Sequence, residues 1–248
     1  MNLNNKSYYN FIDKKTIPLV FIHGVGLDHN MWSPQINYFK NYSTITYDLL
    51  GHGRTPFKKE KIKMQDYIEQ LLSIIEFLKL EKINLVGFSI GSLIALNFAS
   101  DFQNKLNSLT LIATTYKRTS EQRQAVIDRV NLAKLNKPIS QLAMKRWFTD
   151  EYLKKNPIIY EEFTKILTKD GEDQKNFIKA YELFAHYKDD LEKIKKINTK
   201  TLVMTGSIDP GSTPEMSKKL SNDLNNSLYT EINNGKHLCS IECADDVN

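Results

Sequence analysis

The feature that most constrains this chain is a sharp turn at Ser89, placed between an apolar run and a run with helical spacing. Residues 83–88 are mainly apolar and predict a buried strand, whereas residues 90–96 are small or apolar and predict a helix. Gly87 and Gly91 stand two residues either side of the serine, where strand and helix would pass too close for a side chain. The sequence therefore predicts a strand, turn and helix with the Ser89 hydroxyl at the tip.

The rest of the chain repeats this alternation of strand and helix. Continuous apolar character indicates strands covered on both faces, and alternation with helices indicates right-handed crossovers. We therefore expect an α/β fold with a mostly parallel central sheet flanked by helices. The predicted strands are 17–22, 43–48, 83–88, 106–113, 201–206 and 227–232, and core helices are predicted near 34–39, at 64–80, after Ser89 and at 214–224.

The alternation stops between residues 116 and 191, where only helical patterns occur. Helices are predicted at 120–135, with Ser120 as N-cap, and at 140–148, 157–167 and 171–187. So long a helical stretch between two strands predicts an inserted cap over the carboxyl edge of the sheet. The expected organisation is a core of residues 1–115 and 192–248 with a cap of residues 116–191. The sequence reaches Asn248 within what resembles the opening of another helix, so a short terminus or a missing final helix is expected.

Composition excludes several other classes of protein. Charged residues make up 25% and apolar residues 41% of 248 residues, and no apolar run approaches the length of a membrane span. The polar N-terminus lacks the apolar region of a secretory signal, so a cytoplasmic location is expected. The net charge of +5 comes from scattered lysines, which argues against nucleic-acid binding. Cys239 and Cys243 match neither a disulfide framework nor a zinc site and are expected to be buried or half-buried structural thiols. Oligomeric state stays open.

A serine hydroxyl needs a base, and the base needs a third group to fix its tautomer. Of the five histidines, only His237 follows the last predicted strand. Asp209 follows the penultimate strand and is the expected acid; the alternative is an aspartate that only stabilises its turn. Asp48 is the rival acid, and we interpret it as structural. The order Ser89, Asp209, His237 is the order of the α/β hydrolases.

An acyl-transfer site also needs two backbone donors for the developing oxyanion. The amide of Ile90 lies at a predicted helix N-terminus, and the amide of Val25 lies in the loop after the first predicted strand. That loop contains Gly24 and Gly26, but a dinucleotide-binding loop would need a third glycine where His29 stands, so this interpretation fails.

Five ordered motifs together resemble the α/β-hydrolase superfamily, and more narrowly its 3-oxoadipate enol-lactonase-like and carboxylesterase-like members. They are residues 21–28, 48–55, 87–91, 206–209 and 235–237. The resemblance implies a Ser89–Asp209–His237 triad with Val25 and Ile90 as oxyanion donors. Ser92 replaces a common second glycine and Thr55 a usual serine. The serine nucleophile argues against the branches that use aspartate.

These observations predict a serine hydrolase that cleaves esters or lactones of small molecules through an acyl-enzyme on Ser89, with no cofactor or metal. Carbon–carbon bond hydrolysis, haloperoxidase-type chemistry or a slowly hydrolysing ligand sensor remain alternatives with the same triad. The side chains expected to line the substrate pocket are His29, Trp32, Phe88, Met144, Trp147, Ile208 and Leu238.

Overall fold

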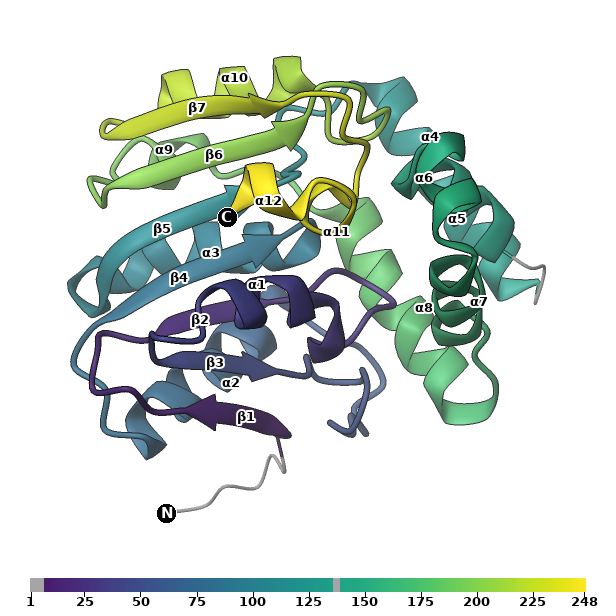
Figure 1. Ribbon diagram of the computed structural model, residues 1–248. Helices are drawn as coiled ribbons and strands as arrows, with labels where there is room; N and C mark the ends of the chain where they lie inside the picture. The colour runs from purple at the N-terminus through teal and green to yellow at the C-terminus, as the bar shows by residue number, and fades with distance from the viewer. Residues whose placement is uncertain (1–6, 136–138) are drawn as a thin grey trace.

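The computed structural model describes residues 7–135 and 139–248, which are built on one seven-stranded sheet (Figure 1). The strands lie in the order β1-β3-β2-β4-β5-β6-β7, and all pair in parallel except β1. The mostly parallel sheet predicted from the sequence is therefore confirmed. The strands are β1 (Tyr9–Ile12), β2 (Leu19–Ile22), β3 (Thr44–Tyr47), β4 (Ile83–Phe88), β5 (Leu106–Ile112), β6 (Thr201–Gly206) and β7 (Ser227–Ile232).

Strand β1 was not predicted. It has four residues, alternates half-buried with exposed positions, and pairs antiparallel with β3 at the edge of the sheet. An edge strand this short lacks the continuous apolar run of the central strands. Its pattern is therefore too weak to be distinguished from the polar residues around it.

Helices cover both faces of the sheet (Figure 1). One face carries α1 with the two short C-terminal helices, and its apolar cluster includes Phe21, Trp32 and Leu238. The opposite face carries α2, α3 and α10, with Leu71, Leu93 and Leu220 in a second cluster. These helices are α1 (Ser33–Tyr38), α2 (Met64–Phe77), α3 (Ile90–Phe102), α10 (Pro214–Asp223), α11 (Cys239–Glu242) and α12 (Ala244–Val247), with short 3-10 turns at His29–Trp32 and Gln103–Lys105.

The segment of residues 116–191, here called the cap segment, is helical where the structure describes it. It lies beyond the carboxyl ends of the central strands, beside the edge toward which their arrows point (Figure 1). Its helices are α4 (Ser120–Lys134), α5 (Ser140–Trp147), α6 (Asp150–Lys155), α7 (Pro157–Leu167) and α8 (Gly171–His186), and α9 (Leu191–Ile194) leads back to the sheet.

Two details of the cap segment differ from the sequence-based expectation. The N-cap of α4 is Thr119 rather than Ser120, because Thr119 has the extended backbone and its hydroxyl accepts from the amide of Gln122 at 3.2 Å. Helix α6 was not predicted, since its six residues are too few to show a helical period.

None of the helices in the described ranges is both long and apolar enough to cross a membrane. Of the two cysteines, Cys239 is buried and Cys243 only half-buried, and both are free thiols.

Candidate active site

Ser89 stands at the junction of β4 and α3 in a backbone conformation that side chains rarely adopt, with φ 55° and ψ −116°. Its amide donates to the carbonyl oxygen of Ile112 at 2.9 Å. A Cβ on Gly87 would lie 2.7 Å from Ser92 Cα, and one on Gly91 would lie 2.7 Å from the carbonyl oxygen of His23. Both glycines are thus required by the close approach of backbone, which holds the strained serine at the edge of the sheet.

His237 and Asp209 reach Ser89 from the loops that follow β7 and β6. His237 Nε2 lies 3.2 Å from Ser89 Oγ, and its Nδ1 lies 2.7 Å from Asp209 Oδ2. Asp209 Oδ1 accepts from the amides of Gly211 and Ser212 at 2.8 and 3.0 Å. All three of the predicted triad side chains are buried and in contact in the expected order.

The contact with Asp209 determines which tautomer His237 adopts. A carboxylate accepts hydrogen bonds, so Asp209 favours the tautomer of His237 with a proton on Nδ1, which leaves Nε2 able to accept a proton from Ser89. The Phe88 ring packs against the His237 ring with centroids 5.0 Å apart. Gly206 allows the close approach of the His237 loop, since a Cβ there would overlap the carbonyls of Gly235 and Lys236.

The two amides expected to hold an oxyanion lie beside this serine. Ile90 is the first residue of α3, and Val25 lines the same cavity as Ser89 and His237. Within residues 7–135 and 139–248, neither amide donates a hydrogen bond to another protein group. Both amides therefore lack a protein acceptor in these ranges, and the amide of Ile90 lies at the positive end of a helix dipole.

A cavity of about 150 Å³ lies between the triad and the cap segment. Two of the side chains expected to line it, Phe88 and Trp147, do so. Three others lie in the apolar core instead: Trp32, Met144 and Leu238 are fully buried in the cluster under α1. Their size and apolar character suit a core as well as a pocket, which is why the sequence does not separate the two.

The remaining two expected pocket residues point elsewhere. Ile208 is 50% exposed, and it lies outside the cavity lining although it precedes Asp209. His29 is engaged by Asp48, which accepts from its backbone amide at 2.9 Å and lies 2.7 Å from its Nδ1.

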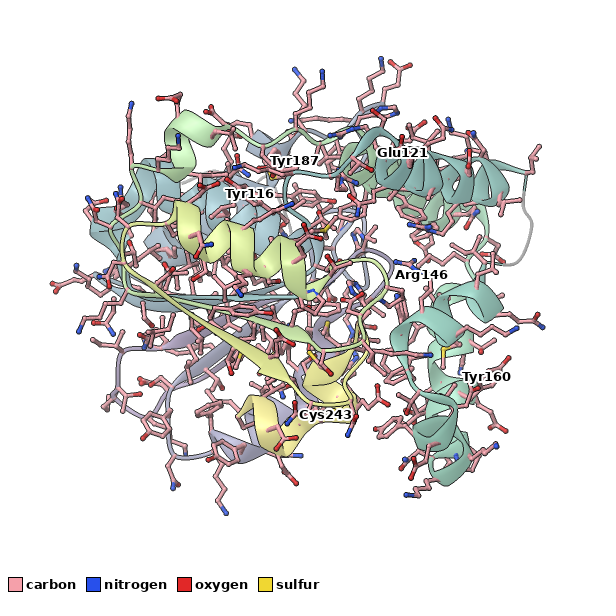
Figure 2. All side chains as sticks on the ribbon, turned by 90° about the horizontal axis from the view of Figure 1, so that it is seen from above. Tyr116, Glu121, Arg146, Tyr160, Tyr187 and Cys243 are labelled. Atoms are coloured by element: carbon pink, nitrogen blue, oxygen red, sulfur yellow. The ribbon has the colours of Figure 1, made fainter. Side chains whose placement is uncertain are left out.

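The cap segment supplies lining residues that the sequence analysis missed. Three are arginines, at positions 118, 129 and 146, and three are aromatic, Phe177, Tyr181 and Phe184. Arginines are ordinarily solvated, so only the fold shows that these three line the same cavity as Ser89. Figure 2 shows Arg146 where the cap helices meet the core.

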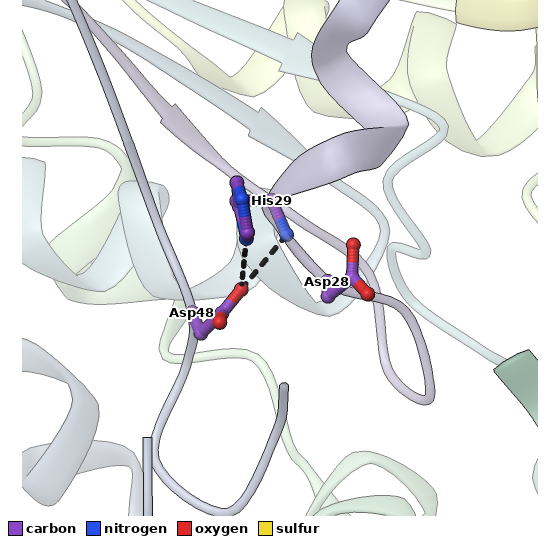
Figure 3. A group of neighbouring side chains, drawn as sticks. All are labelled: Asp28, His29 and Asp48. Atoms are coloured by element: carbon purple, nitrogen blue, oxygen red, sulfur yellow. Dashed lines mark hydrogen bonds and ion pairs between the residues drawn. The ribbon is translucent and has the colours of Figure 1, made fainter. Parts of the chain in front are cut away.

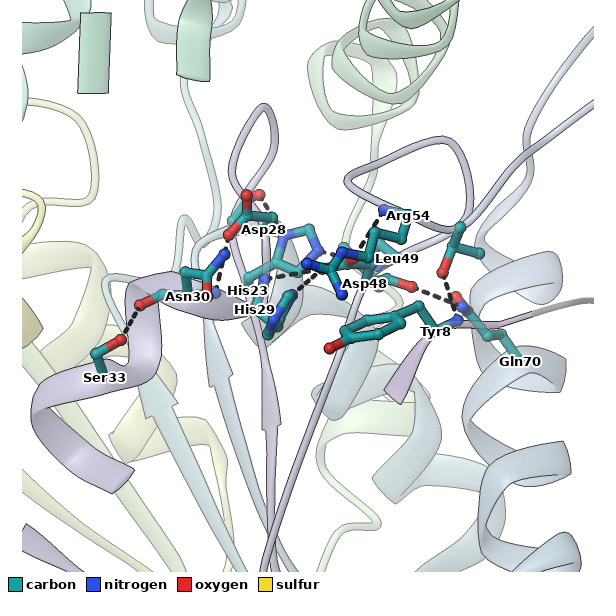
Figure 4. A network of polar contacts seen from close by, with 12 residues as sticks. Tyr8, His23, Asp28, His29, Asn30, Ser33, Asp48, Leu49, Arg54 and Gln70 are labelled. Carbon is teal, nitrogen blue, oxygen red and sulfur yellow. Dashed lines mark hydrogen bonds and ion pairs between the residues drawn. The ribbon is translucent and has the colours of Figure 1, made fainter. Parts of the chain in front are cut away.

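Asp28, His29 and Asp48 form the one cluster of metal-ligand type found in the part of the chain that the structure describes (Figure 3). Its carboxylates are already used as acceptors. Asp48 Oδ2 accepts from the amide of Arg54 at 2.8 Å, and Asp28 Oδ1 accepts from the amide of Asn30 at 2.8 Å. These contacts join the loops after β2 and β3 (Figure 4), as expected of a structural carboxylate rather than a metal site.

Comparison with known proteins agrees with this architecture. A family model described as "alpha/beta hydrolase fold" matches residues 17–243. The chain is 31% identical over 250 residues to (E)-2-((N-methylformamido)methylene)succinate hydrolase of Acinetobacter baylyi, covering 99% of this chain and 92% of that protein. It is 28% identical to 3-oxoadipate enol-lactonase 1 of the same organism, covering 90% of this chain and 83% of that protein.

Among solved structures, the enol-lactonase of Burkholderia xenovorans superposes with a TM-score of 0.90 at 21% identity, covering 98% of this chain and 94% of that one. At this identity the superposition shows a shared fold. The sheet, the matched residues 17–243 and the identity of nearly a third over almost the whole chain lead to one conclusion: the protein belongs to the α/β-hydrolase fold family.

Proposed function

We propose that this protein is a serine hydrolase that cleaves carboxylic esters or lactones of small molecules through an acyl-enzyme on Ser89. The observation that carries the proposal is the continuous contact from Ser89 through His237 to Asp209 beside a cavity. A buried serine with an oriented base is the arrangement that makes an otherwise weak hydroxyl nucleophilic.

The reaction would proceed in two acyl transfers. His237 Nε2 takes the Ser89 proton as Oγ attacks the carbonyl carbon, and the amides of Val25 and Ile90 stabilise the resulting oxyanion. His237 then gives the proton to the leaving alkoxide. Water attacks the acyl-enzyme with His237 again as base, and the acid is released as Ser89 regains its proton. Asp209 holds the ring and stabilises its cationic form.

The names of the relatives support hydrolysis as the reaction class. One relative is named as a hydrolase and the other as an enol-lactonase, whose name specifies a cyclic ester. Ester and lactone cleavage use the same attack and the same oxyanion, so one site serves both.

The test is turnover of a panel of simple esters and lactones by the full chain and by Ser89→Ala. The substitution should lower kcat at least about a thousandfold, because it removes the group that forms the acyl-enzyme. Ser73→Ala, a change of an exposed serine on α2, is the matched control and should keep full activity. Ester turnover in Ser89→Ala close to that of the unsubstituted protein would refute the proposal.

A second measurement separates an enzyme from a slow ligand sensor. Product released with time should greatly exceed one equivalent of protein, and a fluorophosphonate should label Ser89 stoichiometrically, as read by mass spectrometry. Release that stalls near one equivalent would indicate a sensor instead.

A further inference from the structure

The cavity beside Ser89 has an unusual cationic lining. Three of the five arginines of the chain, Arg118, Arg129 and Arg146, line it. Among the described residues no lysine does, although lysines provide most of the positive charge of the sequence. All three come from the cap segment. Arginine presents a planar fork of donors that matches a carboxylate, whereas lysine is a point charge, so this choice of cation indicates recognition of a planar anion.

The lining contains no balancing negative charge. No aspartate or glutamate is among its residues, and none of the three arginines pairs with a carboxylate in residues 7–135 or 139–248. Asp209 lies nearby, but its oxygens accept from His237 and from the amides of Gly211 and Ser212. In the described ranges, the three guanidinium groups thus form no direct ion pair, and only the more distant carboxylates of Asp189 and Asp209 act on Arg118 and Arg146.

Arg118 is the most constrained of the three. It is only 9% exposed, and its Nη2 donates to the carbonyl oxygens of Phe184 and Tyr187 at 2.7 and 3.1 Å. Its Nη1 is buried and has no partner among the described residues. A buried donor without an acceptor costs free energy, and a ligand anion would remove that cost.

The other two arginines share a second contact region. Arg129 Nε donates to the Tyr181 hydroxyl at 3.0 Å, which fixes the plane of its guanidinium on α4. Arg146 reaches from α5 to the loop after β6, where its Nη2 lies 2.6 Å from the position a Cβ on Gly211 would take. Two helices of the cap segment thus direct cations toward the triad.

Burial and neighbouring arginines lower the pKa of two of these arginines by more than the carboxylates of Asp189 and Asp209 raise it. Burial, with the neighbouring charge of Arg123, lowers the pKa of Arg118 to about 10. Burial and then the positive charge of Arg129 lower the pKa of Arg146. Both groups stay protonated at neutral pH, so the cavity keeps its positive charge.

We propose that the cavity selects esters or lactones that carry a carboxylate in addition to the bond that is cleaved, with Arg118, Arg129 and Arg146 binding that carboxylate. The inference rests on the proposed function for the identity of the reaction, but its anion site can be measured separately. Apolar side chains such as Val126 and Phe177 supply the rest of the lining, which suits a short carbon skeleton between the two groups.

The first experiment compares two esters that differ only at the far end. Monoethyl glutarate carries a carboxylate where ethyl pentanoate carries a methyl group, and ethanol release is followed for both. We expect kcat/KM to be at least about tenfold higher for monoethyl glutarate, since charge-assisted hydrogen bonds are worth a factor of ten or more. Equal values, or a preference for ethyl pentanoate, would overturn the inference while leaving the proposed ester hydrolysis intact.

Variants then locate the source of that preference. Arg129→Gln and Arg146→Gln should each lower the ratio of the two kcat/KM values, and together they should bring it close to one. Arg123→Gln removes the same charge from α4, but Arg123 donates to the Tyr187 carbonyl and does not line the cavity. This control should keep the ratio. If Arg123→Gln lowered this ratio as much as Arg129→Gln does, the preference would come from the overall positive charge of the cap segment and not from a binding site.

Binding provides a readout that does not depend on turnover. Titration of full-length Ser89→Ala with glutarate by calorimetry should show saturable binding that Arg129→Gln weakens at least about tenfold. Lack of glutarate binding would overturn the anion site even if ester hydrolysis is observed, and binding without any ester turnover would overturn the proposed function alone. Inorganic phosphate is the comparison ligand, and phosphate binding tighter than glutarate would overturn the assignment to a carboxylate.

Discussion

At the scale of single residues, Asp48 shows how one buried carboxylate can hold two loops at the edge of the sheet. Its side chain is fully buried and accepts from the amides of His29 and Arg54, with His29 Nδ1 also within 2.7 Å. The first of these loops carries Val25. The position of the proposed oxyanion donor therefore depends on a carboxylate that lies outside the proposed triad.

Asp48→Asn should lower the free energy of unfolding by about 3 kcal/mol, because an amide replaces a charged acceptor of several buried hydrogen bonds. Urea denaturation measures the effect. Asp128→Asn changes an exposed aspartate that accepts only from Gln124 and should shift stability by less than about 0.5 kcal/mol. Equal stability of the two variants would contradict a structural role for Asp48.

Some residues of the candidate site could be predicted from the sequence, and others could not. Ser89, Asp209 and His237 could be placed together because each follows a strand, and the carboxyl ends of parallel strands share one edge. Arg129 and Arg146 could not, because they lie on helices whose orientation over the sheet depends on tertiary packing. Their residue type gives no signal of a pocket, since arginine is usually solvated.

At the scale of elements, the crossing of β4 and α3 determines the reactive geometry. The strand-and-helix order of the core was predictable because its apolar runs are long and periodic. Strand β1 and helix α6 were not, since four and six residues carry too little pattern. Sequence periodicity does not predict how closely the backbones of β4 and α3 approach each other. Gly87 and Gly91 indicate this close approach only because they lack side chains.

Gly87→Ala should prevent folding or lower the melting temperature by more than 10 °C, since its methyl group would lie 2.6 Å from the Gly91 carbonyl carbon and rigid backbone would have to move. Thermal denaturation followed by circular dichroism tests this. Gly171→Ala is the control: Gly171 has φ 50° but no atom within 4 Å of the added methyl, so only about 1 kcal/mol of backbone strain is expected. Comparable losses in both variants would exclude close packing as the cause.

At the scale of the whole molecule, two buried histidines link stability to pH. The rings of His23 and His52 lie 5.2 Å apart, and His23 Nε2 accepts from the amide of Leu49, which requires an unprotonated nitrogen. Burial lowers the pKa of His23, and burial followed by the charge of His23 lowers the pKa of His52 well below its usual value. The folded state therefore favours the neutral forms.

Because the unfolded chain binds these protons more readily, the free energy of unfolding should fall as pH drops from about 7 to 5. Urea denaturation at several pH values gives the slope. His52→Gln should make the slope shallower, whereas His186→Gln, at an exposed position, should leave it unchanged. If the free energy of unfolding changed with pH equally in the unsubstituted protein and both variants, His52 would not contribute to the pH dependence of stability.

The cap segment leaves the core after β5 and returns to it at β6, and these strands are parallel neighbours in the sheet. Its two ends are thus anchored to adjacent strands, and Arg118, Arg129 and Arg146 all lie within it, while Ser89, Asp209 and His237 lie outside it. The residues proposed to select the substrate and those proposed to react with it therefore lie in separate stretches of the chain. If both proposals hold, grafting residues 116–191 from another member of the family should change substrate preference and leave the proposed triad of the recipient in place.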